Sequence, residues 1–175
     1  MRNVKIIATI LCCLLSSSPL RAADVTVNFT GNIIDSTCTI DTPDVQVPIG
    51  DFERRYFKTG GTGTLTVPKI FTIRLSQCPS VITSASFLFE GNADPTDGTL
   101  LALTAEEGVA KGIGVRLRFN TNGTPPVAIN QETLEPVANN GGSITSTFQA
   151  AYESTQTEVT PGKANATATV TIIYQ

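Results

Sequence analysis

Two residue types are missing from this chain of 175 residues, which contains no histidine and no tryptophan. Without an imidazole, the chain cannot form a Ser/His/Asp or Cys/His nucleophile system, and it cannot bind a metal through histidine. Charged residues make up only 15% of the chain, which excludes a coiled coil. These absences exclude most familiar hydrolases, so we expect no enzyme activity, no cofactor and no metal site.

Positive charge is also scarce. The formal net charge is −3 and the isoelectric point is near 4.9. Removal of residues 1–22, which hold three cations and no acidic residue, would lower the charge to −6. An acidic chain is repelled by phosphate backbones and anionic lipid surfaces, so we expect no nucleic-acid partner. The acidic side chains of residues 94–97 and 106–107 are expected to be solvated loop charges.

Long apolar runs are rare, and the one that stands out lies at the start of the chain. Residues 6–15 follow a positively charged start, and residues 20–22 (LRA) resemble a cleavage site. These ten residues, at 1.5 Å each, span about 15 Å, which is half of a hydrocarbon core of roughly 30 Å. The pattern predicts a secretory signal peptide over residues 1–22, with no membrane insertion of the chain after its cleavage.

Cysteine is scarce beyond the signal peptide. Cys12 and Cys13 lie within residues 1–22, so Cys38 and Cys78 alone remain. In an oxidising compartment two cysteines predict one disulfide, with a free thiol pair or a metal site as the alternatives. Closing a loop of about 40 residues stabilises a fold by roughly 4 kcal/mol in the chain-entropy model.

What the sequence does contain is alternation of apolar and polar residues with a period of two, which is typical of strands with one buried face. No helix of normal length is expected, residues 105–110 are expected to form a single helical turn at most, and residues 122–123 (NG) suit a hairpin turn. The alternation and the turn spacing predict an all-β sandwich of the immunoglobulin type. The expected strands cover residues 23–34, 37–40, 45–49, 65–75, 85–89, 100–103, 114–119, 143–152 and 164–175.

The two ends of the mature chain indicate how such a sandwich would be used. The last expected strand ends on the final residue, which leaves no chain to cover its far edge. Another alternating strand, residues 23–34, precedes the first remaining cysteine. Long apolar edges without cover aggregate, so the last strand is expected to need a partner. Strand addition of the donor-strand type would supply one.

Several short motifs follow one another in a defined order, together with both cysteines. Gly162 is fourteenth from the end of the chain, and Tyr174 is the penultimate residue. The motifs are residues 23–40, 71–78 (FTIRLSQC), 89–91 (FEG), 112–117 (GIGVRL), 148–152 (FQAAY) and 160–175. With these motifs the chain resembles the type 1 fimbrial pilins of the chaperone-usher pathway over essentially its whole mature length.

The resemblance implies an incomplete immunoglobulin-like sandwich of six strands, whose seventh strand is supplied in trans. It divides the chain into a signal peptide (residues 1–22), an N-terminal donor-strand extension (residues 23–35) and a pilin domain (residues 36–175). The implied donor strand presents Val25, Val27, Phe29, Gly31 and Ile33. The implied groove and chaperone-binding edge consist of Gly162, Ala168, Val170, Ile172, Tyr174 and Gln175.

The resemblance also implies partners and a location. A periplasmic chaperone would lend a strand to the groove and hold the carboxylate of Gln175 with basic residues. At the outer-membrane usher, the N-terminal extension of the next subunit would replace the chaperone strand. The chain is thus expected to pass through the periplasm to a fimbrium on the bacterial cell surface, where it contacts neighbouring fimbrial subunits and supports adhesion.

The position of the subunit within a fimbrium is a separate question. Only two residues precede Val25 in the mature chain, which favours a minor or adaptor subunit over a major one. The alternatives are a major rod pilin of the same pathway and a self-contained, secreted immunoglobulin-like binding module.

Overall fold

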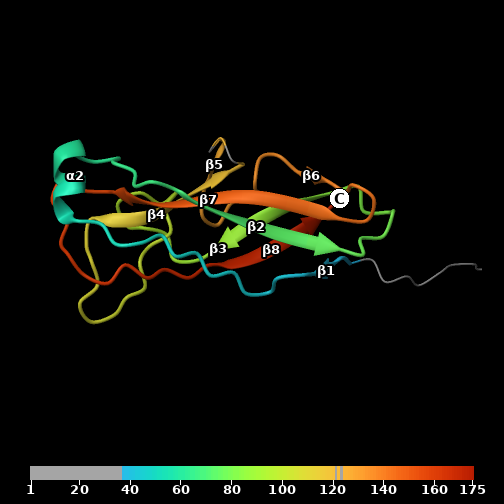
Figure 1. The fold of residues 1–175 in the computed structure, drawn as a ribbon, viewed down its shortest axis with the longest axis horizontal. Helices are drawn as coiled ribbons and strands as arrows, with labels where there is room; N and C mark the ends of the chain where they lie inside the picture. Colours follow the sequence, from blue (N-terminus) through green and yellow to red (C-terminus); the bar gives the residue numbers. More distant parts are fainter. Residues whose placement is uncertain (1–36, 121, 123) are drawn as a thin grey trace, which may run out of the picture. The chain divides into compact units, whose positions relative to one another are not determined.

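The computed structural model of the chain describes residues 37–120, 122 and 124–175 (Figure 1). All of them belong to one unit of the chain, Asp35–Gln175. The predicted signal peptide lies outside the described residues, and so does the predicted donor strand with all five residues of its donor face. The described residues therefore all fall within the predicted pilin domain.

Two antiparallel sheets form this domain. The five-stranded sheet has the order β1-β2-β7-β4-β5, and the three-stranded sheet has the order β6-β3-β8. Figure 1 shows β2 and β7 side by side, and β3 beside β8. The strands are β1 (Thr39–Ile40), β2 (Lys69–Ser76), β3 (Ser84–Glu90), β4 (Ile113–Phe119), β5 (Pro126–Val127), β6 (Val137–Ala138), β7 (Ile144–Ser154) and β8 (Thr169–Tyr174).

The strand order matches an immunoglobulin sandwich that lacks its last strand. In that fold, strands A, B, E and D form one sheet, and C, F and G form the other. The order β1-β2-β7-β4 reproduces A-B-E-D, and the pair β3-β8 reproduces C-F. Within the described residues no strand takes the place of G beside β8. The prediction of an all-β, incomplete immunoglobulin-like fold is confirmed, with the two-residue strands β5 and β6 added to the six expected strands.

Five phenylalanine side chains form the centre of the core between the sheets. The ring of Phe148 on β7 is fully buried, and its centroid lies 4.9 Å from that of Phe89 and 5.4 Å from that of Phe87. Phe71 and Phe119 each lie 5.5 Å from the same ring. Because side chains alternate between the two faces of a strand, the period-two pattern turns these rings inward from four different strands.

The predicted disulfide is present. The sulfur atoms of Cys38 and Cys78 are 2.09 Å apart, and the bond closes a sequence separation of 40 residues. Cys38 directly precedes β1, and Cys78 lies just beyond the end of β2. Because both thiols are engaged, the alternatives of a free thiol pair and a metal site do not apply. The bond fastens the short edge strand β1 to its neighbour.

One short helix forms where the sequence pattern indicated none. Helix α2 (Arg54–Gly60) has seven residues and one buried side chain, that of Phe57. Phe57 packs in a small cluster with Ala110, Ile113 and Val159. A helix with a single buried position has no apolar repeat, so the sequence offered no helical period to detect. In the described part of the chain, no helix combines the length and apolar character that crossing a membrane requires.

Four expected strands also differ, and one of them, expected over residues 65–75, begins only at Lys69. Residues 45–49 form no strand, although Val47 packs against the core and Ile49 is buried. Residues 100–103 contribute only isolated bridges through Leu101, and β8 begins at Thr169 instead of residue 164. At residues 45–49 and 164–168 the alternation of side chains is present but no neighbouring described strand extends the hydrogen-bond ladder, whereas Leu100 and Leu101 are both buried and do not alternate. Alternation of side chains with a period of two indicates which side of a segment is buried. A strand also needs a neighbouring strand to which its backbone can hydrogen-bond.

Candidate functional site

Among the described residues, strand β8 is paired along one of its two edges. Its six residues pair antiparallel with β3, with Ile172 opposite Phe87 and Val170 opposite Phe89. No strand in the described residues pairs with its other edge. The outward-facing N–H and C=O groups of such an edge are a ready template for another strand.

The side chains of β8 differ in burial from those of the strand beside it. The inward-facing residues of β3, Ala85, Phe87 and Phe89, are buried. Their register partners on β8 pack against the same core but remain half-exposed. The half-buried row continues upstream of β8 at every second residue, and it consists of Ala164, Ala166, Ala168, Val170, Ile172 and Tyr174. Apolar side chains that contact a core and still face solvent leave apolar area for a partner to cover.

Four of the predicted groove residues, Ala168, Val170, Ile172 and Tyr174, therefore lie in one row along this edge. The fifth, Gln175, continues the line of β8. Its main-chain N–H donates to the oxygen of Ser84 at 2.9 Å, and its main-chain oxygen accepts from the N–H of Thr83 at 2.7 Å. The hydroxyl of Thr83 donates to the same oxygen at 3.1 Å. The last residue is thereby held beside the start of β3.

The sixth residue, Gly162, lies apart from that row. A Cβ atom at this position would lie 2.4 Å from the oxygen of Gly108 and 2.5 Å from the nitrogen of Ala110. The adjacent Lys163 makes two backbone hydrogen bonds to the same segment, both of 2.9 Å. The absence of a side chain at Gly162 thus allows residues 160–163 to approach the backbone of residues 108–110, upstream of β8.

Two side chains that sequence reasoning missed fasten the segment just before β8. The carboxylate of Glu106 accepts hydrogen bonds from Lys163 Nζ at 3.0 Å and from Asn165 Nδ2 at 3.2 Å. These two hydrogen bonds hold the pKa of Glu106 below its ordinary value. The hydroxyl of Tyr152 donates to the oxygen of Ala164 at 2.8 Å, and burial raises the pKa of Tyr152. The open edge is thus anchored at its upstream end.

The acidic side chains expected to be solvated are in part bound. Glu106 forms the ion pair just described, and Asp97 pairs with Arg116 at 3.0 Å. The carboxylate of Asp94 accepts from the N–H of Thr96 at 2.8 Å, which closes a turn. Ion-pair partners this distant in sequence leave no local signature, so composition alone predicted solvation.

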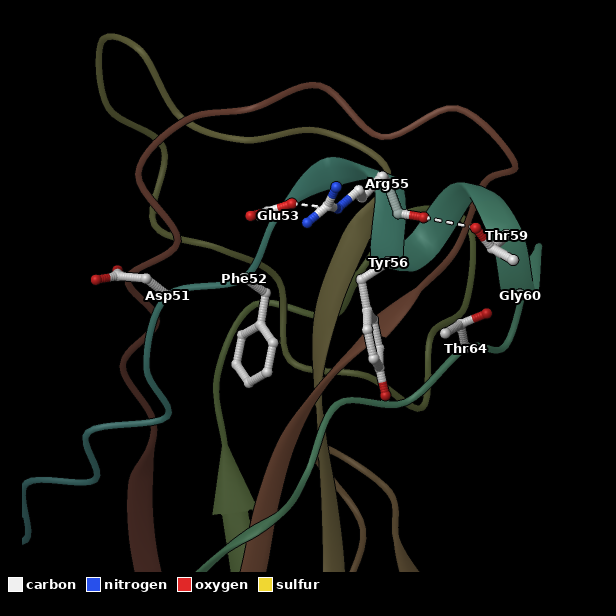
Figure 2. Close-up of a pocket in the computed structure, with 8 residues that line it drawn as sticks. All are labelled: Asp51, Phe52, Glu53, Arg55, Tyr56, Thr59, Gly60 and Thr64. Carbon is white, nitrogen blue, oxygen red and sulfur yellow. Dashed lines mark hydrogen bonds and ion pairs between the residues drawn. The ribbon is translucent and has the colours of Figure 1, made fainter.

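A wide hollow of about 660 Å³ lies beside α2 (Figure 2). The rings of Phe52 and Tyr56 lie in it with centroids 6.0 Å apart, and the tyrosine hydroxyl donates to the oxygen of Leu65 at 2.9 Å. An ion pair between Glu53 and Arg55 lies near the rings. The hollow contains none of the predicted site residues. The charged groups of Glu53 and Arg55 pair with each other, and the hydroxyl of Tyr56 already has an acceptor nearby.

The chain is similar in sequence to known proteins over most of its length. The family model described as "Fimbrial protein" matches residues 27–175. The "Probable major fimbrial subunit LpfA" of Escherichia coli O157:H7 is 30% identical over 177 residues, which cover 98% of this chain and 97% of that protein.

Solved structures of fimbrial proteins are similar to this chain as well. The type I fimbria protein and antigen of Burkholderia pseudomallei is 33% identical with a TM-score of 0.61, over 85% of this chain and 96% of that one. A subunit of a chaperone-usher pilus, whose structure addresses rod uncoiling, has a TM-score of 0.65 at 17% identity, over 91% of this chain and 100% of that one. The latter likeness concerns the fold alone. On the match of the family model and the relatives at 30% identity or more, the chain belongs to the fimbrial protein family.

Proposed function

We propose that this chain is a structural subunit of a chaperone-usher fimbria that polymerises by donor-strand exchange. In this proposal residues 1–22 are a signal peptide, residues 23–35 are the donor strand, and residues 36–175 are the acceptor domain. The function is structural and supports adhesion; no enzymatic step is part of it. The observation that carries the proposal is the half-exposed apolar row on the unpaired edge of β8.

The geometry of the row supports strand addition. Its members from Ala166 to Tyr174 occupy five alternate positions, and the donor face from Val25 to Ile33 also occupies five alternate positions. An antiparallel strand in the place of G would set one row against the other while its backbone pairs with β8. Gly31 leaves room within the donor face where the two chains come closest.

The energy of such an addition would be large. Burying Val25, Val27, Phe29 and Ile33 at about 1.5 to 3 kcal/mol each gives roughly 6 to 12 kcal/mol, an upper value before ordering costs. Main-chain hydrogen bonds along β8 add to this. A donor held so firmly would join subunits into a durable fibre without a covalent bond.

The same exposed edge supports the proposed partners. A bare β8 would aggregate during export, so a periplasmic chaperone is expected to cover it until the outer-membrane usher brings the next subunit. Basic residues of the chaperone would hold the carboxylate of Gln175. The fibre then lies on the bacterial cell surface, with neighbouring fimbrial subunits on both sides of each copy.

For the position in the fibre we propose a minor or adaptor subunit, because only two residues precede Val25 in the mature chain. A major rod subunit is the second candidate, which the name of the relative in Escherichia coli O157:H7 favours. The abundance of this chain in purified fimbriae decides between them. A dominant band would establish the rod subunit, and a trace band would establish the minor one.

The test of the function uses the full chain expressed with its export and assembly partners. Phe29→Asp places a charge on the donor face, and Asn28→Asp places the same charge on the opposite face of the same strand. We expect the polymer ladder of unboiled samples to disappear with Phe29→Asp and to persist with Asn28→Asp. A ladder that persists with both variants would contradict donor-strand exchange through this segment.

A further inference from the structure

A small hollow lies on the outer face of the five-stranded sheet, away from the open edge of β8. Its volume is about 160 Å³, and it lies over β7 between β4 and the segment that leads into β2. Its lining consists of the apolar residues Leu65, Pro68 and Ala151, the polar residues Thr66 and Gln149, and the two arginines Arg116 and Arg118. The hollow thus combines apolar walls with a positively charged side.

The two arginines differ in what already binds them. The guanidinium of Arg116 contacts Glu153 at 2.6 Å and Asp97 at 3.0 Å, so its charge is compensated within the chain. Arg118, two residues along β4, has no ion pair with any described residue. On the far side of β7, with Gln149 between it and Arg118, Ile70 on β2 is 60% exposed. One cation and an adjoining apolar surface therefore remain available on this face.

A complementary feature protrudes at the edge of the three-stranded sheet. Leu134 is 79% exposed, more than any other large apolar side chain in the described residues. Glu132 and Glu135 flank it, are exposed, and form no ion pair within the described part of the chain. The buried Thr133 between them fastens the segment to β3, because its N–H donates to the oxygen of Phe87 at 2.9 Å and its hydroxyl accepts from the N–H of Phe87 at 3.0 Å. Leu134 is therefore exposed on a segment whose backbone is fastened to β3.

We propose that Leu134 of one copy docks into the hollow of a second copy, with Glu135 or Glu132 facing Arg118. The inference rests on the proposed function in its second form, a major rod subunit, since such a fibre brings many copies of the chain side by side. The occupant is a second copy because the two features complement each other in both apolar character and charge. Within one molecule they cannot meet, because Leu134 remains exposed and lies on the other sheet.

Such a contact joins two different surfaces and is therefore heterologous. A heterologous contact repeats from copy to copy and generates a ring or an open helical array. It would act in addition to the donor strand: the donor strand sets the order of subunits along the fibre, and this contact would stack subunits laterally. Loss of the contact would loosen the stacking while leaving the chain of subunits intact.

A cysteine cross-link in assembled fibres of the full chain tests the contact. Copies carrying both Arg118→Cys and Glu135→Cys are oxidised mildly, boiled without reductant and separated by size. We expect covalent oligomers from this pair. The matched control pair is Arg118→Cys with Val81→Cys, whose valine is 59% exposed at a site outside both features, and it is expected to give none.

A second substitution in the same cysteine background separates docking from chance collision. Leu134→Asp should lower the yield of oligomers about tenfold, whereas Val81→Asp should leave it unchanged. Oligomer yields equal to those of the control pair, or yields insensitive to Leu134→Asp, would overturn the inference. The polymer ladder of unboiled samples is recorded in parallel. Its presence without specific cross-links rejects only the lateral contact, and its absence in the unsubstituted chain rejects the proposed function itself.

Discussion

The four edges of the two sheets are not alike. Within the described residues, the five-stranded sheet ends in β1 and β5 and the three-stranded sheet ends on one side in β6, and each of these strands has two residues. The remaining edge is β8, which has six residues and a half-exposed apolar row. Natural proteins shorten edge strands to prevent pairing with other chains. Three edges follow that rule and β8 does not, which supports the proposal that β8 accepts a strand from a partner.

The largest expected effect comes from a charge on the inward side of β8. Ile172 and Ile173 are adjacent and both half-buried, but Ile172 packs against the core and faces the proposed donor. Ile172→Asp should abolish polymer formation, because an unpaired carboxylate would be buried when the donor strand arrives, at a cost of several kcal/mol. Ile173→Asp is the matched control on the opposite face. Equal loss of the polymer ladder with both variants would contradict the assignment of the inner row.

A second comparison sets the fully buried Phe148 against the half-exposed Phe71 in the same core. Phe148→Ala should lower the free energy of unfolding by about 3 to 5 kcal/mol, since the ring is fully buried against four others. Phe71→Ala should cost less, because Phe71 is half-exposed on β2. Urea denaturation of the oxidised protein measures both. If Phe71→Ala cost as much as Phe148→Ala, the core would be as closed to solvent around Phe71 as it is around Phe148.

A smaller effect is expected at the segment upstream of β8. Gly162→Ala should cost about 1 to 3 kcal/mol, because its Cβ would collide with the backbone of residues 108–110. Gly98→Ala is the matched control, since no heavy atom outside its chain neighbours lies within 4 Å of a Cβ built there. Thermal unfolding of the two variants checks the difference. Equal melting temperatures would show that the close approach to the backbone of residues 108–110 does not require a glycine at position 162.

The smallest effect is a pH dependence at the anchor of β8. The pKa of Glu106 is lowered in the folded chain by hydrogen bonds from Lys163 and Asn165. Its contribution is therefore present above the ordinary carboxyl value near 4.5 and is lost as the pH falls through the lowered folded value. Glu106→Gln should narrow the gap in stability between pH 7 and acidic pH, as measured by urea denaturation. An unchanged pH profile would show that this ion pair does not stabilise the fold.

Much of the fold was predictable from local pattern. The period of two placed Phe71, Phe89 and Phe148 on inner faces, and two remaining cysteines predicted one disulfide. The half-buried row up to Tyr174 also reflects alternation, which depends only on which side of a strand meets the core.

What the sequence could not provide depends on partners distant along the chain. Helix α2 is stabilised by the packing of Phe57 against residues more than fifty positions later in the chain. No repeat of apolar residues within the helix itself could therefore predict it. The ion pair of Glu106 with Lys163 spans 57 residues. Residues 45–49 have the side-chain alternation of a strand, yet no described strand completes their ladder. Side-chain pattern is a local property, whereas ladders and ion pairs are properties of the assembled fold.

The central claim is that the domain lacks a strand and that residues 23–35 can supply it. It is tested most directly by thermal unfolding of the oxidised chain without residues 1–35, alone and with a peptide that copies residues 23–35. We expect a low melting temperature for the domain alone and a large rise with the peptide. The rise should disappear when Phe29 and Ile33 of the peptide are replaced by Asp. A domain that melts at high temperature, reversibly and as a monomer without any peptide would be a self-contained sandwich, and it would contradict the account.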